Sequence, residues 1–193
     1  LGVAIADVSG KGVPASLIMA ICRSVLRSQA MGNPSPAEVL QKVNRQLYPD
    51  IKEDMFISMA YLVLDLVRGG VTLARAGHDA PLLYKQKSQT VAPLKTPGMV
   101  VGIDSGDVFD RLTTDVTVPL ECNDCILLYT DGITEALDNE GNEFGLERTI
   151  ASVQSSAKEG AQAMVTRLID DLRNFVGSTP QNDDITMIAI RKT

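Results

Sequence analysis

Three aspartates have the residue type, spacing and surroundings to support chemistry. Asp7, Asp131 and Asp183 each lie at the end of an apolar run typical of a strand, beside glycine, a second aspartate or a short turn. Aspartate disfavours strands, and burying a carboxylate without a partner is costly. The three side chains therefore need a cation or another partner. A site built of carboxylate oxygens suits Mg²⁺ or Mn²⁺ rather than zinc.

The order of the flanking runs bears on whether these carboxylates can meet. Asp7 and Asp131 follow their runs, whereas Asp183 and Asp184 precede the last one. If the last strand is antiparallel to the other two, all of these carboxylates lie at one edge of the sheets. Two divalent ions about 4 Å apart could then share a bridging carboxylate and a water, and stabilise an in-line phosphoryl transfer. No side-chain nucleophile is required, which suits a chain with one histidine.

Each aspartate taken alone also has a plain structural interpretation. Asp-Gly, Asp-Val-Ser-Gly and Asn-Asp-Asp are sequences that form turns. Residue types and spacing therefore leave two alternatives open, a metal site and a set of unrelated turn residues.

Three further motifs could carry function, and each has a simpler interpretation. Residues 9–12 look like a phosphate loop, but the P-loop pattern requires glycine where Ile5 stands and Ser or Thr after the lysine. We interpret them as a turn that begins a helix. His78 is interpreted as a turn residue that holds a hairpin by hydrogen bonds, with general-acid catalysis as the alternative. Cys122 and Cys125 are interpreted as loop or packing residues, with a redox pair or half of a zinc site as alternatives.

The composition is typical of one soluble globular domain. The chain has 193 residues, of which 45% are hydrophobic and 22% charged, and its net charge of −6 argues against a nucleic-acid partner. No apolar run approaches the roughly 20 residues of a membrane-spanning helix, and no signal peptide is visible. Three cysteines are too few for a disulfide framework and favour a reducing, cytoplasmic location. Because the sequence begins with Leu1 inside an apparent strand, we expect a segment of a longer protein.

Helices are predicted where apolar residues recur at helical spacing. Pro14 lies in the first turn of one helix, and Ser35 caps the next, with Glu38 three residues further on. The clearest pattern covers residues 159–176, where the apolar positions follow the i, i+3, i+4, i+7 rule. The predicted helices cover residues 13–31, 36–47, 146–156 and 159–176.

Strands are predicted from apolar runs bounded by turn residues. Residues 55–66 are apolar at both alternating positions, which indicates a strand covered on both faces. A hairpin turn at Gly69-Gly70 and a second turn at residues 77–81 predict an antiparallel meander through residues 71–76 and 82–84. Residues 88–109 are interpreted as a loop with short strands. Further strands are predicted at residues 1–6, 112–118, 125–130 and 185–191. The elements together predict an α+β domain of two stacked antiparallel sheets with helices outside them.

Six segments, in this order and over nearly the whole chain, resemble one protein family. They are DVSGKGVPA at residues 7–15, FISMAYLVLD at 56–65, AGHDAPLL at 76–83, YTDGITEA at 129–136, FG at 144–145 and QNDDIT at 181–186. The chain resembles the metal-dependent protein phosphatases of the type 2C superfamily. More closely, it is similar to the bacterial branch typified by stage II sporulation protein E and the phosphatases that regulate sigma factors.

The resemblance implies a fold and a metal centre. The fold would be a β-sandwich of two antiparallel sheets flanked by helix pairs, with two Mn²⁺ or Mg²⁺ ions at one end. Asp7 would bridge both ions, the Val8 carbonyl would help hold one, and Asp131 and Asp183 would complete the ligands. Asp184 and Gly132 would lie just behind these ligands.

The resemblance also implies where the chain departs from its family and what controls it. The helices predicted at residues 13–31 and 36–47 match the pair thought to control activity in this branch. Family members have an earlier strand pair that supplies another acidic ligand, so we expect residues 1–193 to form a single phosphatase domain that lacks its first strands. An open sheet edge of this kind would favour a homodimer.

The expected function is that of a serine/threonine protein phosphatase. Metal-activated water would hydrolyse phosphoserine or phosphothreonine on a regulatory protein of the anti-anti-sigma type, under an upstream sensor domain of the parent protein. The alternative is a catalytically impaired domain of the same fold that acts as a signalling or docking module.

Overall fold

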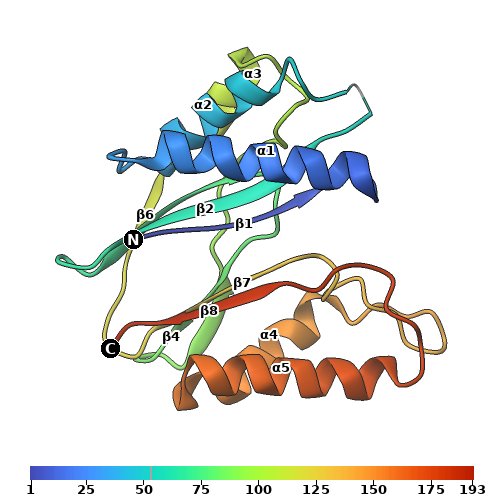
Figure 1. The fold of residues 1–193 in the computed structure, drawn as a ribbon. Helices are drawn as coiled ribbons and strands as arrows, with labels where there is room; N and C mark the ends of the chain where they lie inside the picture. Colours follow the sequence, from blue (N-terminus) through green and yellow to red (C-terminus); the bar gives the residue numbers. More distant parts are fainter. Residues whose placement is uncertain (53) are drawn as a thin grey trace. The chain divides into compact units, whose positions relative to one another are not determined.

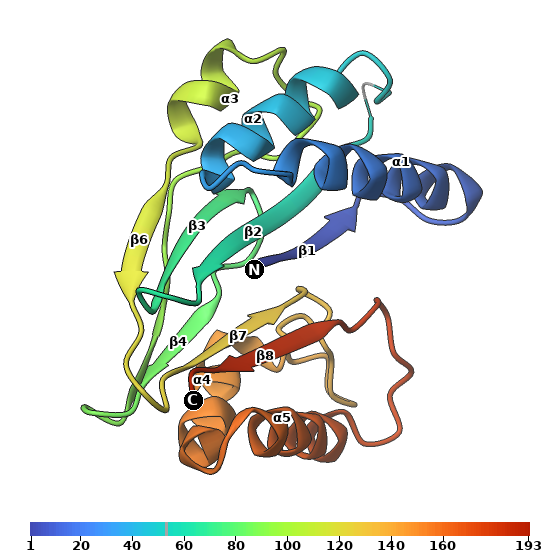
Figure 2. The ribbon, with the colours of Figure 1, turned by 60° about the vertical axis from the view of Figure 1, so that its left-hand side comes forward.

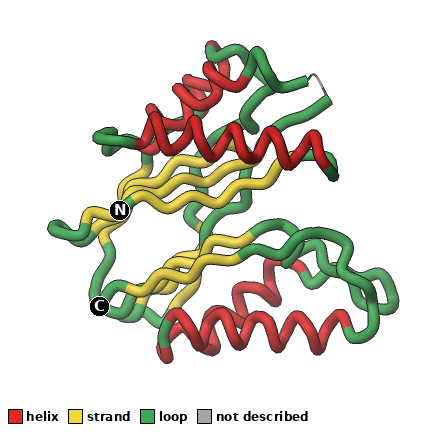
Figure 3. Tube along the Cα trace, viewed as in Figure 1, coloured by secondary structure: helices red, strands yellow, loops and turns green. Residues whose placement is uncertain are grey.

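A computed structural model describes residues 1–52 and 54–193 of the chain. They form two compact units, Leu1–His78 with Lys95–Pro119, and Asp79–Leu94 with Leu120–Thr193. Each unit contains a four-stranded antiparallel sheet with helices packed against it (Figure 3). The predicted α+β class with two antiparallel sheets is confirmed.

The first unit is built on a sheet in which the strands follow the order β1-β2-β3-β6. Figure 2 shows these four strands side by side, with α1 and α2 over one face and α3 next to α2. The strands are β1 (Gly2–Val8), β2 (Ile57–Asp65), β3 (Gly70–Ala76) and β6 (Val116–Pro119), and the helices are α1 (Val13–Ala30), α2 (Pro36–Leu47) and α3 (Asp107–Leu112).

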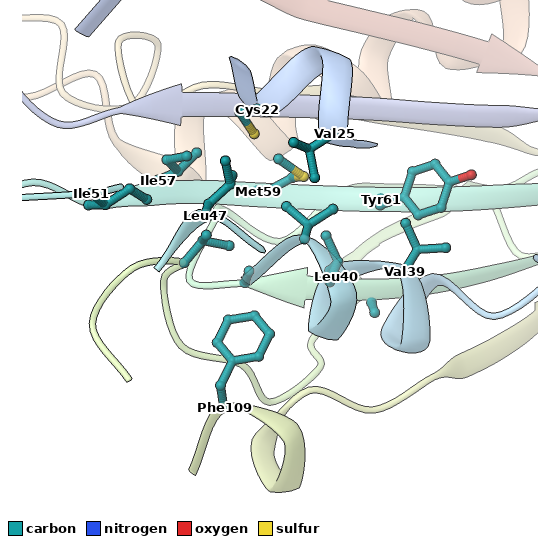
Figure 4. Close-up of a cluster of buried hydrophobic side chains, with 14 of the residues drawn as sticks. Cys22, Val25, Val39, Leu40, Leu47, Ile51, Ile57, Met59, Tyr61 and Phe109 are labelled. Carbon is teal, nitrogen blue, oxygen red and sulfur yellow. The ribbon is translucent and has the colours of Figure 1, made fainter. Parts of the chain in front are cut away.

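Alternating residues of this sheet build the core of the first unit (Figure 4). Ile57, Met59 and Tyr61 of β2 point to the helical side, where they meet the buried face of α2. Since side chains alternate along a strand, Asp7 and Ser58 lie on the opposite face of the sheet. The buried residues supplied by the helices are Cys22 and Val25 of α1 and Val39, Leu40, Val43 and Leu47 of α2.

The start of α2 follows the predicted capping signal. The Ser35 hydroxyl accepts a hydrogen bond from the backbone N–H of Glu38 at 3.1 Å. A carboxylate oxygen of Asp115 accepts the N–H of Ala37 at 2.7 Å. These acceptors satisfy two of the four N–H groups that an α-helix leaves unpaired at its N-terminus, so α2 begins where its sequence predicts.

The second unit is built on a sheet in which the strands follow the order β5-β4-β7-β8. The strand predicted at residues 125–130 is confirmed as β7, and all five of its residues are buried. Helices α4 and α5, labelled in Figure 1, supply Val153, Met164 and Leu168 to the core of this unit. The strands are β4 (Leu82–Lys85), β5 (Thr90–Pro93), β7 (Cys125–Tyr129) and β8 (Met187–Arg191), and the helices are α4 (Gly145–Ser156), the 3₁₀ turn η1 (Ala157–Glu159) and α5 (Ala161–Val176).

The predicted three-strand meander is wrong in its last strand. β2 and β3 form the expected hairpin, but β3 pairs next with β6, and β4 pairs with β5 and β7 in the other sheet. The turn at residues 77–81 does not close a hairpin, because Gly77 bridges in parallel to Met59 and the chain then passes into the second unit at Asp79.

The strand predicted at residues 112–118 is also wrong in its first half, because α3 (Asp107–Leu112) ends there, residues 113–115 are irregular, and β6 begins only at Val116. One carboxylate oxygen of Asp104 accepts the N–H groups of Gly106, Val108 and Phe109 and so begins the helix. Hydrogen bonds from these N–H groups lower the pKa of Asp104. The short strand β5 confirms part of the prediction for residues 88–109.

Two smaller features complete the fold. β1 extends through Val8, so Asp7 lies inside the strand near its end rather than after it. In the described residues, no helix is both long enough and apolar enough to cross a membrane.

Candidate functional site

Antiparallel pairing brings two of the predicted carboxylates to the same end of one sheet. β7 and β8 pair from Cys125 with Arg191 to Tyr129 with Met187. Asp131 follows the last paired residue of β7, and Asp183 and Asp184 precede the first paired residue of β8. For these residues of the second unit, the expected antiparallel arrangement of the strands is confirmed.

Thr130 ties the two carboxylate segments together. Its buried hydroxyl donates to the carbonyl of Asp184 and accepts the N–H of Thr186, both at 3.0 Å. The backbone N–H of Thr130 donates to the carbonyl of Thr186 at 3.1 Å. These bonds extend the β7–β8 ladder by one step, so the backbones next to Asp131 and Asp183 are fixed relative to each other.

Gly132 lies directly against the segment that carries Asp183. A Cβ atom built on Gly132 would lie 2.4 Å from the carbonyl oxygen of Asp184, a distance that real Cβ atoms do not show. Its φ is not in the left-handed region, so the need for glycine comes from the close approach of two backbones. The side chain of Asp183 accepts the N–H of Asp184 at 2.8 Å, which orients its carboxylate.

The end of the sheet carries concentrated negative charge. Burial and the nearby carboxylates of Asp131, Glu143, Asp79 and Asp183 raise the pKa of Glu135. No Lys or Arg side chain of residues 1–52 and 54–193 forms a salt bridge with Asp131 or Asp183. The sequence interpretation missed Glu135, although it stands in the same Thr-Asp-Gly-Ile-Thr-Glu segment as Asp131.

A cleft of about 530 Å³ opens beside these carboxylates within the second unit. The segment after Asp131, helix α5 and the loop before β8 line it, and Gly132 and Asp183 belong to its wall. The apolar lining residues are Ala136, Leu137, Ile169, Leu172, Val176, Pro180 and Ile185, and the charged ones are Glu135, Glu143, Arg173 and Asp183. The cleft can therefore hold an apolar group next to the carboxylates.

Asp7 and Val8 lie in the first unit, at the end of β1. Asp7 stands opposite Ser58 in the β1–β2 ladder, and Val8 stands opposite Ile57. The next residue, Ser9, fastens the strand end, because its N–H donates to the Phe56 carbonyl and its hydroxyl accepts the Phe56 N–H. The backbone that carries both predicted ligands is therefore held in place.

Cys122 and Cys125 have the surroundings of the loop or packing residues that the sequence predicts, whereas His78 does not hold a hairpin, because β3 and β4 belong to different sheets. His78 is buried and hydrogen-bonds to Ser58 at the end of the β3 segment. All three cysteines are free, with Cys22 and Cys125 buried and Cys122 exposed. The turn at residues 9–12 leads into α1 as predicted.

The donor chemistry of the second unit fits a hard divalent cation. Carboxylate oxygens are the ligands that Mg²⁺ and Mn²⁺ prefer, and Asp131 and Asp183 present them without a salt bridge to any cationic side chain that the structure describes. Across the described part of the chain, no group of three or more His, Cys, Asp or Glu side chains is already arranged to hold a metal ion.

Comparison with known proteins shows that the whole chain is similar to part of a phosphatase. Phosphoserine phosphatase RsbU of Bacillus subtilis (strain 168) is 31% identical over 194 residues, which cover 100% of the chain and 56% of that relative. The chain thus spans about half the length of this curated relative.

Solved structures of low sequence identity share the fold. The SiaA-PP2C domain of Pseudomonas aeruginosa matches with a TM-score of 0.85 at 21% identity, covering 100% of the chain and 76% of that structure. The catalytic domain of the phosphatase PstP from Mycobacterium tuberculosis, solved with two manganese ions, matches with a TM-score of 0.68 at 13% identity, covering 100% of the chain and 88% of that structure. The family model described as "Stage II sporulation protein E (SpoIIE)" matches residues 1–193. The chain therefore belongs to the stage II sporulation protein E family.

Proposed function

We propose that the chain is a metal-dependent protein-serine/threonine phosphatase domain. The observation that carries the proposal is the pair Asp131 and Asp183. β7 and β8 bring both to one end of a sheet, and neither forms a salt bridge within the described residues. The pKa of Glu135 is raised by burial and by the neighbouring carboxylates, and a divalent cation would offset the charge of those carboxylates. The 31% identity to a relative named phosphoserine phosphatase gives the reaction class.

The proposed ligands are Asp7, the Val8 carbonyl, Asp131 and Asp183, for two Mn²⁺ or Mg²⁺ ions. When bound, such ions supply an activated water and neutralise charge on the phosphoryl group. Within the chain, Thr130 and Gly132 keep the Asp131 and Asp183 segments in register. Asp184 supports Asp183 through its backbone N–H.

The proposed substrate is a phosphorylated regulatory protein of the anti-anti-sigma type. One structural relative, which matches with 26% identity, is described as the RsbU and RsbW domains of Rv1364c from Mycobacterium tuberculosis. We propose that the two units act as one phosphatase domain in the cytoplasm, under an upstream sensor domain, and that two copies can pair. The apolar cleft beside Asp183 would take a substrate side chain near the phosphoserine.

Hydrolysis by the purified chain tests this function. We expect Mn²⁺-dependent release of phosphate from p-nitrophenyl phosphate and from a phosphoserine protein. Asp7→Asn, Asp131→Asn and Asp183→Asn should each lower kcat/KM at least about a hundredfold, because each removes a charge that holds the cation. Asp170→Asn, at an exposed position of α5, is the matched control and should retain activity.

Two results would overturn the proposal. One is activity that persists in the three ligand variants or in the presence of a chelator. The other is a chain that binds no Mn²⁺ by calorimetry yet still binds its regulatory partner, which would favour the docking-module alternative.

A further inference from the structure

The only histidine of the chain is buried next to β2, the strand that pairs with the Asp7 strand β1. His78 is 4% exposed, and its Nδ1 atom lies 2.8 Å from the hydroxyl oxygen of Ser58. A buried imidazole that shares a short hydrogen bond with a hydroxyl has a defined orientation. The Ser58 hydroxyl can both donate and accept a hydrogen bond, so it can bond a second group besides His78.

Ser58 stands directly opposite Asp7. The two residues are partners in the antiparallel β1–β2 ladder, so their side chains project from the same face of the sheet. Directly opposed residues have Cβ atoms about 4.5–5.5 Å apart, which brings a serine hydroxyl within reach of an aspartate carboxylate. His78, Ser58 and Asp7 therefore follow one another across the sheet face that α1 and α2 leave uncovered.

Contacts with Arg75 and Val100 hold the backbone next to His78 in place. The Arg75 guanidinium donates to the His78 carbonyl at 2.5 Å and also to the carbonyl and hydroxyl of Thr96. Gly77 has φ +70, and a Cβ atom there would lie 2.3 Å from a side-chain carbon of Val100. These contacts fix where the imidazole ring can lie, so its position does not depend on Ser58 alone.

We propose that His78 and Ser58 are positioning residues for the Asp7 carboxylate. An ionised carboxylate only accepts hydrogen bonds, and a serine hydroxyl has a single proton to donate. If that proton goes to Asp7, the hydroxyl oxygen must accept from His78. The resulting order is His78 Nδ1–H to Ser58 Oγ–H to an Asp7 oxygen, which fixes the Nδ1–H tautomer of the ring.

This inference rests on the proposed function, in which Asp7 binds the metal ions. Groups that hydrogen-bond to metal ligands fix ligand orientation, and their loss commonly costs about 10–100-fold in metal affinity. Ser58 and His78 would act in this way on Asp7 without contacting the substrate themselves.

Calorimetric titration of the metal-free chain with Mn²⁺ tests whether Ser58 and His78 position the Asp7 carboxylate. Ser58→Ala and His78→Leu should weaken Mn²⁺ binding by about tenfold, since both remove the oriented proton. His78→Asn should bind Mn²⁺ within about twofold of the wild type, because an asparagine amide places an N–H donor near the Nδ1 position. Asn44→Leu serves as the control, because it removes a buried hydrogen-bonded side chain of the same unit on α2.

A structural role for His78 predicts a different pattern. In that case Mn²⁺ affinity would follow stability in Asn44→Leu and His78→Leu alike. We expect instead that thermal unfolding shows both variants to be less stable, while only His78→Leu lowers Mn²⁺ affinity. If all three histidine and serine variants bind Mn²⁺ like the wild type, or if His78→Asn fails like His78→Leu, the proposal is overturned.

A spectroscopic readout tests the hydrogen-bond order even if the chain binds no metal. Because there is one histidine, a sample labelled with ¹⁵N-histidine gives a single pair of ring signals. We expect the Nδ1–H tautomer, and a change in the Nδ1 signal on Asp7→Asn. An Nε2–H tautomer, or an Nδ1 signal that Asp7→Asn leaves unchanged, would overturn the inference. If the wild-type chain binds no Mn²⁺, only the proposed function is overturned.

Discussion

Gly132 and Asp184 approach each other so closely that a Cβ atom on Gly132 would lie 2.4 Å from the Asp184 carbonyl oxygen. The hydroxyl of Thr130 donates to the same carbonyl at 3.0 Å. The segment that begins with Asp131 is therefore packed, backbone against backbone, on the segment that carries Asp183. The geometry of the two carboxylates depends on this contact and on the pairing of β7 with β8.

Gly132→Ala adds only one methyl group, but it should strongly disturb the contact between Gly132 and the Asp184 carbonyl. The added methyl group meets a backbone carbonyl that cannot rotate away, so we expect a loss of about 1–3 kcal/mol in the free energy of unfolding. Mn²⁺ affinity should fall as well, because the Asp183 segment must move. Urea unfolding and calorimetry measure the two effects. Gly70→Ala is the control, since a Cβ atom there would meet only ordinary contact at 3.5 Å, and equal effects of the two changes would contradict the prediction.

Glu135→Gln should stabilise the metal-free chain. Burial and neighbouring carboxylates raise the pKa of Glu135, so its charged form is less favourable in the folded state than in the unfolded state. This destabilisation is absent at pH values below the pKa that Glu135 has in the unfolded chain. It develops as the pH rises through the higher pKa that Glu135 has in the folded chain. We expect a gain in Tm of about 1–2 °C near neutral pH, kept small by solvent screening, and no gain in acid. A Tm gain that is the same at both pH values would rule out the charge explanation.

Local signals predicted much of the fold. The Ser35 cap with Glu38 gave the start of α2, and the apolar run of β7 gave a strand buried on both faces. Strand partners were harder, because β4 carries the same apolar pattern whether it continues a meander or joins the other sheet. The helix α3 was missed because Asp104, whose carboxylate accepts N–H groups at the start of the helix, has the sequence context of an ordinary turn residue.

The candidate site was predictable where a strand pattern ended in an acidic residue. Asp131 and Asp183 stood out for that reason, and the β7–β8 pairing places them at one end of a sheet. Glu135 was missed, because the burial that chiefly raises its pKa, and part of the charge around it, from Asp79 and Asp183, depend on the fold and not on its own segment. The roles of Ser58 and His78 likewise depend on strand register, which no local pattern specifies.

Ile169→Glu should slow the hydrolysis of a phosphoserine protein but not that of a small-molecule substrate. Ile169 lines the cleft beside Asp183, and a carboxylate there would oppose an apolar substrate side chain. We expect kcat/KM for a phosphoserine protein to fall about tenfold, which corresponds to about 1.4 kcal/mol. Hydrolysis of p-nitrophenyl phosphate should stay unchanged. Thr166→Glu, at an exposed position of α5, is the control, and an equal loss with both substrates would show that the cleft does not recognise the protein.

Only one of the three cysteines should react in the folded chain. Burial raises the pKa of the Cys22 thiol to about 11 and also raises the pKa of Cys125, whereas Cys122 is exposed. A disulfide reagent at mildly alkaline pH should therefore modify one thiol rapidly, and all three after unfolding. Cys122→Ser should abolish the rapid phase and leave phosphatase activity intact. Loss of activity in this variant would revive the redox interpretation of Cys122 and Cys125.

Asp124→Ala should destabilise the second unit in a pH-dependent way. Asp124 is 1% exposed and accepts hydrogen bonds from Lys85 Nζ and from the backbone N–H groups of Gln86 and Glu121. Burial alone would raise the pKa of Asp124, but the bonds from Lys85 and the two N–H groups lower it overall. A carboxyl whose folded pKa is depressed contributes stability above its unfolded pKa and loses it as the pH falls through the folded value.

We therefore expect Asp124→Ala to cost about 3 kcal/mol near neutral pH, because three bonds to a charged group are lost, among them the ion pair with Lys85. The difference from the wild type should shrink in acid, where the wild-type carboxyl is protonated as well. Urea unfolding at several pH values measures it, with Asp170→Asn as the exposed control. A difference that stays constant down to strongly acidic pH would mean that the side chain acts through packing and not through its charge.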